Sequence, residues 1–217
     1  MEFLFIICEG KTELNFVWEV LVPQIQAISD ISCVPIQVGT GTSYGKLKNF
    51  IKITRERNPY AYITTMTDFC DVNRFFPGFD AAKSFPLQQR ILFMQNAMKD
   101  DLADAGIKNI LRIIPHYQLY QFEALLFSNV DILKAEFGVG TNEFEAVLLE
   151  CDAPENINGR PDMKPSHRIE KIVGKNAYNK PTDGNRIAKK IGLETIMDKC
   201  PHFRAWLLVL QQLNPKK

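Results

Sequence analysis

The 217-residue chain is 46% hydrophobic and 24% charged, and its 26 basic and 25 acidic residues leave a net charge of +1. These values are typical of one globular domain, and the near-neutral charge neither indicates nor excludes a polyanion partner. The 5 cysteines form no Cys-x-x-Cys pair and no apolar run is long enough to span a membrane, which excludes a disulfide scaffold, a zinc site of the usual spacing and a transmembrane helix. Because Met1 is followed directly by Glu2 and a short apolar run, we expect no signal peptide and a soluble cytoplasmic protein.

The N-terminal segment predicts a buried strand followed by a helix. The apolar run from Phe3 to Cys8 has no polar alternation, which is typical of a strand covered on both faces; an apolar helical pattern then follows to Val22, before Pro23. Glu9 comes directly after the strand, where open α/β sheets bind ligands, and Glu13 lies about one helical turn further on. Two acids at this edge can hold a divalent cation. In the alternative interpretation they are a solvated strand-end charge and a residue that complements the helix dipole.

A second strand is predicted from Ser32 to Val38, and Pro35 inside it favours an edge position in the sheet. Residues 39–45 are rich in Gly, Thr and Ser and precede a basic helix with Lys46, Lys48, Lys52, Arg55 and Arg57. Such a loop can bind phosphate through its backbone N–H groups, but it lacks the ending of a P-loop, so a flexible connection is the alternative. The basic side chains are either a solvated helix face or a contact for a nucleic-acid backbone.

Two further buried strands are predicted in the middle of the chain, from Tyr60 to Thr67 and from Asn109 to Ile114, with an amphipathic helix from Leu87 to Ala105 between them. Asp68 follows the first of these strands, Asp71 lies three residues later in a loop, and Glu123 lies close in sequence to the end of the second strand. Three acids associated with strand ends (Glu9, Asp68 and Glu123) are more than we expect by chance.

From Ser128 onward the pattern is mostly helical, with helices expected at 130–137, 142–151, 184–192 and 193–213, the last interrupted at Pro201. A long loop is expected from Ala153 to Lys180, and a loop of this length is usually functional or disordered. We therefore expect one α/β domain over 1–217: a mainly parallel central sheet flanked by helices in a core of about 1–127, and a helical C-terminal extension of about 128–217.

The order strand, Glu-Gly, helix and later strand ending in Asp resembles a Toprim domain, the metal-binding α/β fold of type IA and type II topoisomerases, bacterial primases and OLD-family nucleases. Nearly the whole chain resembles one uncharacterised bacterial Toprim-like family, a domain of unknown function. The blocks that carry this resemblance stand at Glu9 to Glu13, Thr65 to Phe69, Phe76 to Gly78, Phe122 to Phe127, Pro165 to Arg168, Gly184 to Ala188 and Cys200 to Trp206.

This resemblance implies a Mg²⁺- or Mn²⁺-dependent nuclease that hydrolyses phosphodiester bonds of DNA or RNA, with Glu9 and Asp68 as the first and second Toprim acids that bind the metal. On this hypothesis Glu13, Glu123 or Asp71 completes a second metal site or acts as a base. The candidates to bind phosphate or stabilise developing charge are Lys164, Ser166, Arg168 and Lys180. The resemblance also suggests an effector of an anti-phage system, with an AAA- or ABC-type ATPase supplied by another chain, because no ATP-binding motif is present here.

Two departures from the Toprim pattern bear on catalysis. Position 70 is Cys where a Toprim domain has its second-site Asp, and Tyr120-Gln121 stands where the family usually reads His-Glu. The alternative function is therefore a catalytically weak module that binds a partner ATPase or nucleic acid without cleavage; a phosphatase or nucleotidyl transferase is a third possibility. For Glu123, the alternative is a buried acid paired with an arginine such as Arg112 or Arg168. For Arg168 and Lys180, the alternative is a solvated loop.

Overall fold

The computed structural model describes residues 2–39, 41, 43–157 and 163–216. Its sheet contains β1 (Glu2–Cys8), β2 (Ile31–Gln37), β3 (Tyr62–Asp68) and β4 (Ile113–Ile114) in the order β2-β1-β3-β4, and every pair is parallel. The short β5 (Tyr117–Gln118) also pairs with β3 in parallel. The predicted mainly parallel α/β sheet is confirmed, and β2, the strand with Pro35, lies at its edge.

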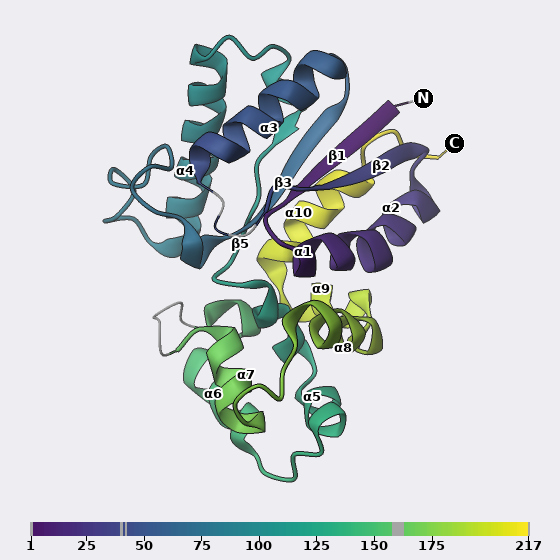
Figure 1. Cartoon of the computed structure of the whole chain (residues 1–217), viewed down its shortest axis with the longest axis vertical. Helices are drawn as coiled ribbons and strands as arrows, with labels where there is room; N and C mark the ends of the chain where they lie inside the picture. Colours follow the sequence, from purple (N-terminus) through teal and green to yellow (C-terminus); the bar gives the residue numbers. More distant parts are fainter. Residues whose placement is uncertain (1, 40, 42, 158–162, 217) are drawn as a thin grey trace.

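Helices cover both faces of the sheet. Leu4, Ile6 and Cys8 of β1 belong to one buried cluster, while Ile7 belongs to a second cluster that includes residues of α3 and α4. Figure 1 shows α3 (Tyr44–Arg57) and α4 (Leu87–Asp104) on one side of the sheet, and α2 (Val22–Ile28) and α10 (Pro201–Gln211) on the other. The apolar run of β1 is therefore explained by burial on both faces.

The first helical segment is longer than the prediction. It starts with α1 (Lys11–Phe16), passes through a π-helical turn (Val17–Leu21) and continues as α2 (Val22–Ile28). Pro23 lacks a backbone N–H and would leave a carbonyl of a regular helix without its donor. The wider π-helical turn ends at Leu21, shortly before the proline, which lies in the first turn of α2, so the helical path continues past it.

The strand expected from Asn109 to Ile114 is largely wrong, since only Ile113 and Ile114 are extended. Asn109 has a positive φ of 57°, and a 3-10 turn follows at Ile110–Arg112. Asparagine tolerates this left-handed conformation, which turns the backbone away from the extended path. Leu111 is consequently 93% exposed, although the apolar pattern predicted a buried strand residue.

The C-terminal part is helical, as expected, but the long loop predicted from Ala153 to Lys180 is wrong because it contains a helix. Pro165 starts that helix at a position where no backbone N–H is needed, and Ile169 is buried on it. After the 3-10 segment Phe122–Ser128, the helices are α5 (Val130–Phe137), α6 (Glu143–Cys151), α7 (Pro165–Val173), α8 (Asn185–Ile191), α9 (Leu193–Lys199) and α10 (Pro201–Gln211). Across the described ranges, none of these helices combines the length and apolar character needed to cross a membrane.

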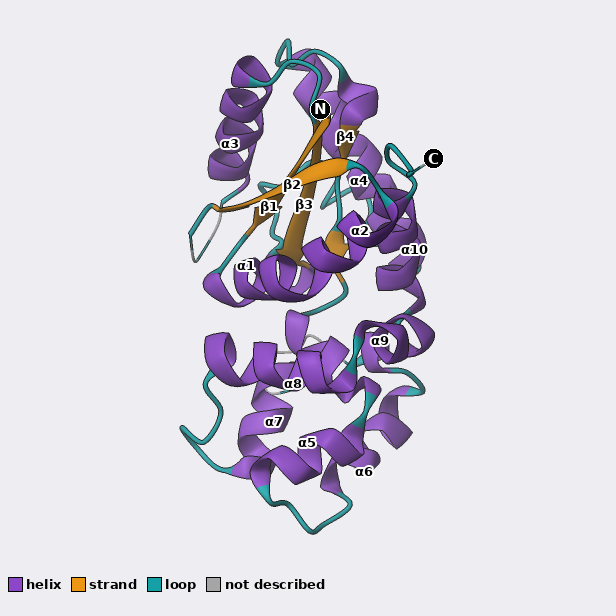
Figure 2. Cartoon of the chain, turned by 90° about the vertical axis from the view of Figure 1, so that its right-hand side faces the viewer, coloured by secondary structure: helices purple, strands orange, loops and turns teal. Residues whose placement is uncertain are grey.

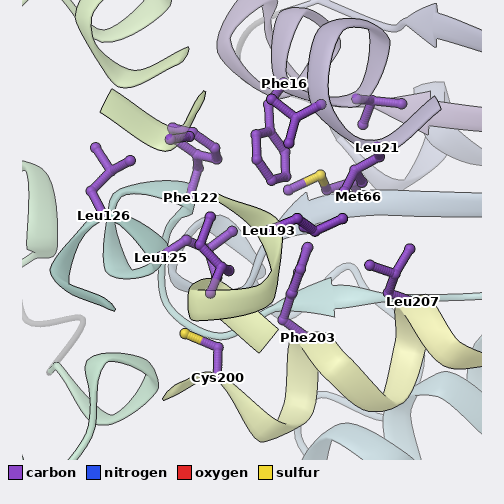
Figure 3. Packing of buried hydrophobic residues seen from close by; sticks show 14 of the residues in the cluster. Phe16, Leu21, Met66, Phe122, Leu125, Leu126, Leu193, Cys200, Phe203 and Leu207 are labelled. Atoms are coloured by element: carbon purple, nitrogen blue, oxygen red, sulfur yellow. The ribbon is translucent and has the colours of Figure 1, made fainter. Parts of the chain in front are cut away.

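One buried cluster joins the helical part to the sheet. Phe16 of α1, Met66 of β3, Phe122 of the 3-10 segment and Phe203 of α10 belong to it, and Figure 3 shows these side chains facing one another. In Figure 2, α5 to α8 lie beyond α1 at one end of the sheet, while α10 runs back alongside the sheet. This packing holds the segment Phe122–Ser128 against the carboxyl ends of β1 and β3, where the candidate site lies.

Candidate metal centre

Glu9 and Asp68 stand at the ends of neighbouring parallel strands. Cys8 is in register with Met66, and the N–H of Glu9 donates to the carbonyl of Met66 over 3.3 Å. Glu9 comes directly after β1 and Asp68 is the last residue of β3. Because the two strands are parallel and both end at the carboxyl edge of the sheet, the two carboxylates lie at the same edge.

Glu13 is fixed by the turn between β1 and α1. Its Oε2 accepts the backbone N–H of Gly10 over 2.9 Å, and the residue is only 8% exposed. A Cβ atom at Gly10 would lie 2.7 Å from this oxygen, so a larger residue there would have to displace the Glu13 carboxylate. Glu13 thus satisfies a backbone donor at the helix start, and it also lies next to the other acids.

Asp68 and Glu123 are linked through the segment that follows β5. The N–H of Phe122 donates to Oδ1 of Asp68 over 2.9 Å, so the next residue, Glu123, is brought to the same edge of the sheet. Glu123 is 2% exposed, and its Oε1 lies 3.1 Å from Nζ of Lys180 and 3.4 Å from the hydroxyl of Tyr178, which donates to it.

Glu123 is therefore a buried, paired acid, but its partner is not the expected arginine. Arg112 pairs with Glu2 and Arg168 pairs with Glu150, whereas Lys180 comes from the segment just before α8. The sequence separation between Glu123 and Lys180 hides this pair from any local pattern.

The acids are close enough to act on one another. Burial raises the pKa of Asp68 well above its usual value, and the negative charges of Glu13, Glu123, Glu9 and Asp71 raise it further. We call these five carboxylates (Glu9, Glu13, Asp68, Asp71 and Glu123) the acidic cluster. Burial also raises the pKa of Glu13, where the charge of Glu123 adds to the effect while backbone hydrogen bonds and Lys180 oppose it. The acidic cluster is thus short of positive charge.

Two lysines contact the acidic cluster. Burial lowers the pKa of Lys180, but the charges of Glu123, Asp68 and Glu13 more than compensate, so that its pKa is raised and it stays protonated. Lys164 pairs with Asp71 over 3.1 Å and also lies beside Cys70. Two ammonium groups against five carboxylates leave a formal excess of negative charge.

The donor set fits a divalent cation. Ligand atoms of Asp68, Cys70 and Asp71 lie within 4.8 Å of one another. Among the described residues, these three form the group that could hold a metal ion. Carboxylates with an excess of negative charge are the environment that hard cations such as Mg²⁺ and Mn²⁺ occupy, while a thiol is a softer ligand. Of the three residues, Asp68 is buried, Cys70 is half-buried and Asp71 is exposed. The structure therefore contains a possible acidic metal-binding site at the carboxyl edge of the sheet.

Besides Lys180, three residues were expected to bind phosphate or stabilise charge, and their surroundings differ. Lys164 lies at the acidic cluster, through Asp71. Ser166 is buried, and both its hydroxyl and its N–H donate to Oε1 of Gln121, over 2.9 and 3.3 Å. Arg168 pairs with Glu150 over 2.6 Å. The structure thus brings one of the three to the acidic cluster and gives the other two different partners.

The sequence reasoning missed two residues of the site. Tyr178 is buried with its hydroxyl on Glu123, and burial together with that acid raises its pKa well above the usual value. Gly184 lets this tyrosine approach, since a Cβ there would lie 2.9 Å from the Tyr178 hydroxyl oxygen and 3.0 Å from a ring carbon of Phe122. The available signal was the block from Gly184 to Ala188 that the family resemblance includes, but the sequence does not show what Gly184 packs against.

Comparison with known proteins places the chain in a family. The model of a family described as Domain of unknown function (DUF4276) matches residues 8–211, and the chain belongs to this family. No curated protein matches the sequence. Among solved structures, the chain is similar to the C-terminal region of the Burkholderia pseudomallei OLD protein, at 17% identity and a TM-score of 0.46, with 96% of each chain covered. It is also similar to the C-terminal region of the Xanthomonas campestris pv. campestris OLD protein, at 15% identity and a TM-score of 0.41, with 95% of this chain and 96% of that one covered.

Proposed function

We propose that this member of the DUF4276 family is a divalent-metal-dependent nuclease that hydrolyses phosphodiester bonds of DNA or RNA. The observation that carries the proposal is the acidic cluster, in which five carboxylates and two lysines meet at the carboxyl edge of a parallel sheet. The sequence resemblance to Toprim domains supports the same chemistry.

Glu9 and Asp68 are the proposed metal ligands, with Asp71 and Glu123 available to complete the coordination. When bound, Mg²⁺ or Mn²⁺ would neutralise charge on the scissile phosphate and lower the pKa of a coordinated water. Asp68 suits this role because its oxygen is already held by the N–H of Phe122, so its orientation is fixed before any ligand arrives.

The remaining side chains have separate roles in the proposal. Glu13 is the candidate base, because its carboxylate is fixed by Gly10 and its raised pKa moves it toward the range suited to proton transfer at neutral pH. Lys180 stays protonated and can stabilise developing negative charge. Lys164 can contact a phosphate directly, whereas Ser166 and Arg168 would first have to release Gln121 and Glu150.

The partner and the location are further parts of the proposal. The chain carries no ATP-binding motif, so an ATPase of another chain would supply any nucleotide-driven step, as in an anti-phage system to which the family resemblance points. A reducing compartment such as the cytoplasm fits Cys8, Cys33 and Cys200, which are buried thiols.

The second candidate is a module that binds nucleic acid or a partner ATPase without cleavage. Cys70 replaces the second Toprim acid, and the pairs Lys164–Asp71 and Lys180–Glu123 already neutralise part of the acidic cluster. A site of this kind can remain folded without metal, so retained partner binding with no metal affinity would favour the module.

A cleavage assay tests the nuclease directly. Plasmid, linear double-stranded DNA, single-stranded DNA and RNA would be incubated with Mg²⁺ and with Mn²⁺, using wild type, Glu9→Ala, Asp68→Ala and the exposed control Glu194→Ala. We expect metal-dependent cleavage that both site variants abolish and the control retains. Cleavage that persists in Glu9→Ala and Asp68→Ala would refute the assignment of the site.

A further inference from the structure

A cavity with a mixed basic and apolar lining lies at the opposite end of the sheet, near the ends of α3 and α4 at the top of Figure 1. Its volume is about 340 Å³, and its lining includes Lys52 and Arg55 of α3, Tyr60 before β3, and Ile107 and Lys108 after α4. β3 separates it from the acidic cluster, and a strand of 7 residues spans roughly 20 Å. The cavity is therefore distinct from the candidate metal centre.

Arg55 is a buried cation without an anionic partner. It is 4% exposed, and its Nη1 donates to the backbone carbonyls of Pro59 (2.8 Å) and Ala61 (2.7 Å) and, at 3.4 Å, to that of Asn58. Within the described ranges, its Nε and Nη2 have no hydrogen-bond acceptor, and no carboxylate forms an ion pair with it. A buried charge without a counter-charge is costly, so this guanidinium favours an anion nearby.

The charges around Arg55 do not supply that anion. Lys52 and Lys108 are both exposed at the cavity, and Arg112 is close enough that its charge adds to burial in lowering the pKa of Arg55. The acid that lines the cavity is Glu56, which is exposed and lies 3.9 Å from Lys52. The cavity therefore has a net positive lining with an unsatisfied buried donor, which is complementary to phosphate.

The other walls of the cavity are apolar and partly aromatic. Pro59, Ala105 and Ile107 line it, and Tyr60 is 76% exposed beside them. An exposed aromatic ring next to a basic pocket is a platform on which a nucleobase can stack. A cavity of this volume lies at the lower end of the range that small ligands occupy.

We propose that this cavity binds a mononucleotide unit, with its phosphate at Arg55, Lys52 and Lys108 and its base against Tyr60. The site goes beyond the proposed nuclease, because it shares no residue with the acidic cluster. The phosphate can belong to a free nucleotide or to one unit of a nucleic-acid strand, and both present the same chemistry to these residues.

Isothermal titration calorimetry tests the site with AMP, adenosine, inorganic phosphate and a short single-stranded oligonucleotide. The proteins are wild type, Lys108→Ala, Tyr60→Ala and Lys171→Ala, which removes an exposed lysine of α7 as the matched control. We expect wild type to bind AMP more tightly than phosphate or adenosine. Lys108→Ala should weaken AMP binding about tenfold, the loss expected for one charge-assisted hydrogen bond, while the control keeps wild-type affinity.

The other arms identify the source of the phosphate and the role of the base. Tyr60→Ala should weaken AMP binding about fivefold and leave phosphate binding unchanged, since stacking contributes about 1 kcal/mol or more per base. If wild type binds the oligonucleotide more tightly than AMP, and Lys108→Ala weakens that binding, the result supports the site and assigns it to nucleic acid. The proposal is overturned if wild type binds neither AMP nor phosphate, or if Lys108→Ala binds them like the control. Asp68→Asn should bind AMP like wild type, so this result does not depend on the nuclease.

Discussion

Replacing Asp68 with asparagine should stabilise the metal-free protein. Asp68 is 9% exposed, its Oδ1 accepts one backbone N–H from Phe122, and four other carboxylates act on it. Asparagine keeps the oxygen that accepts this hydrogen bond and removes a buried charge that its surroundings disfavour. Removing such a charge should raise the free energy of unfolding by about 2 kcal/mol, while function is lost, as is usual for stabilising changes at an active site.

Urea unfolding followed by circular dichroism, in the presence of a chelator at neutral pH, measures this gain. With an m value of about 2 kcal/mol per molar urea, the midpoint of Asp68→Asn should rise by roughly 1 M. The control Asp100→Asn changes an exposed acid of α4 and should leave the midpoint nearly unchanged. A midpoint for Asp68→Asn at or below that of wild type would refute the reasoning.

The pH dependence of folding stability is a second test of the buried charge at Asp68. Because the pKa of Asp68 is raised in the folded state, the folded protein binds this proton more tightly than the unfolded chain does. The stability of wild type should therefore fall as pH rises from the unfolded pKa, about 3.9, through the folded pKa. Asp68→Asn should show a smaller fall over the same range.

Three other substitutions test the packing and the charges around the site. Lys180→Met leaves the Glu123 carboxylate buried with only the Tyr178 hydroxyl as its partner among the described residues, and it should lower the free energy of unfolding, measured in urea, by about 1–3 kcal/mol. Adding Glu123→Gln should restore most of this free energy. No recovery in the double variant would contradict the ion pair. Gly184→Ala should lower the free energy of unfolding by about 1–3 kcal/mol, because the added Cβ would lie 2.9 Å from the Tyr178 hydroxyl oxygen. The control Gly45→Ala lies in the helix α3, where the added Cβ would meet no atom within 4 Å, and it should stabilise the protein. Burial lowers the pKa of His116 well below its usual value, so the stability of wild type should fall as pH falls below about 6.5. His116→Phe should reduce that slope, and an unchanged slope would show that another group carries it.

The fold could be predicted where a local pattern decides the structure. The unbroken apolar run of β1 predicted burial on both faces, and Pro35 predicted an edge strand; both are confirmed. The pattern failed where a single backbone conformation decides the path. Asn109, with its φ of 57°, begins a 3-10 turn where its apolar neighbours predicted a strand, and Pro165 starts a helix inside an expected loop.

The candidate site could be predicted only in part, because most of its contacts join distant segments. Glu9 and Asp68 were recognisable from their positions at strand ends, which a parallel sheet brings to one edge. The pair Glu123–Lys180 and the hydroxyl of Tyr178 depend on how the C-terminal helices pack against the sheet. No periodicity or spacing in the sequence encodes that packing.

The proposed nuclease function depends on the binding of a divalent cation by the acidic cluster. Calorimetric titration of Mn²⁺ into wild type, Asp68→Asn and Asp100→Asn measures this without assuming a substrate. We expect saturable Mn²⁺ binding by wild type and by Asp100→Asn, and loss of binding in Asp68→Asn. Absence of Mn²⁺ binding to wild type, or equal binding in all three proteins, would contradict it.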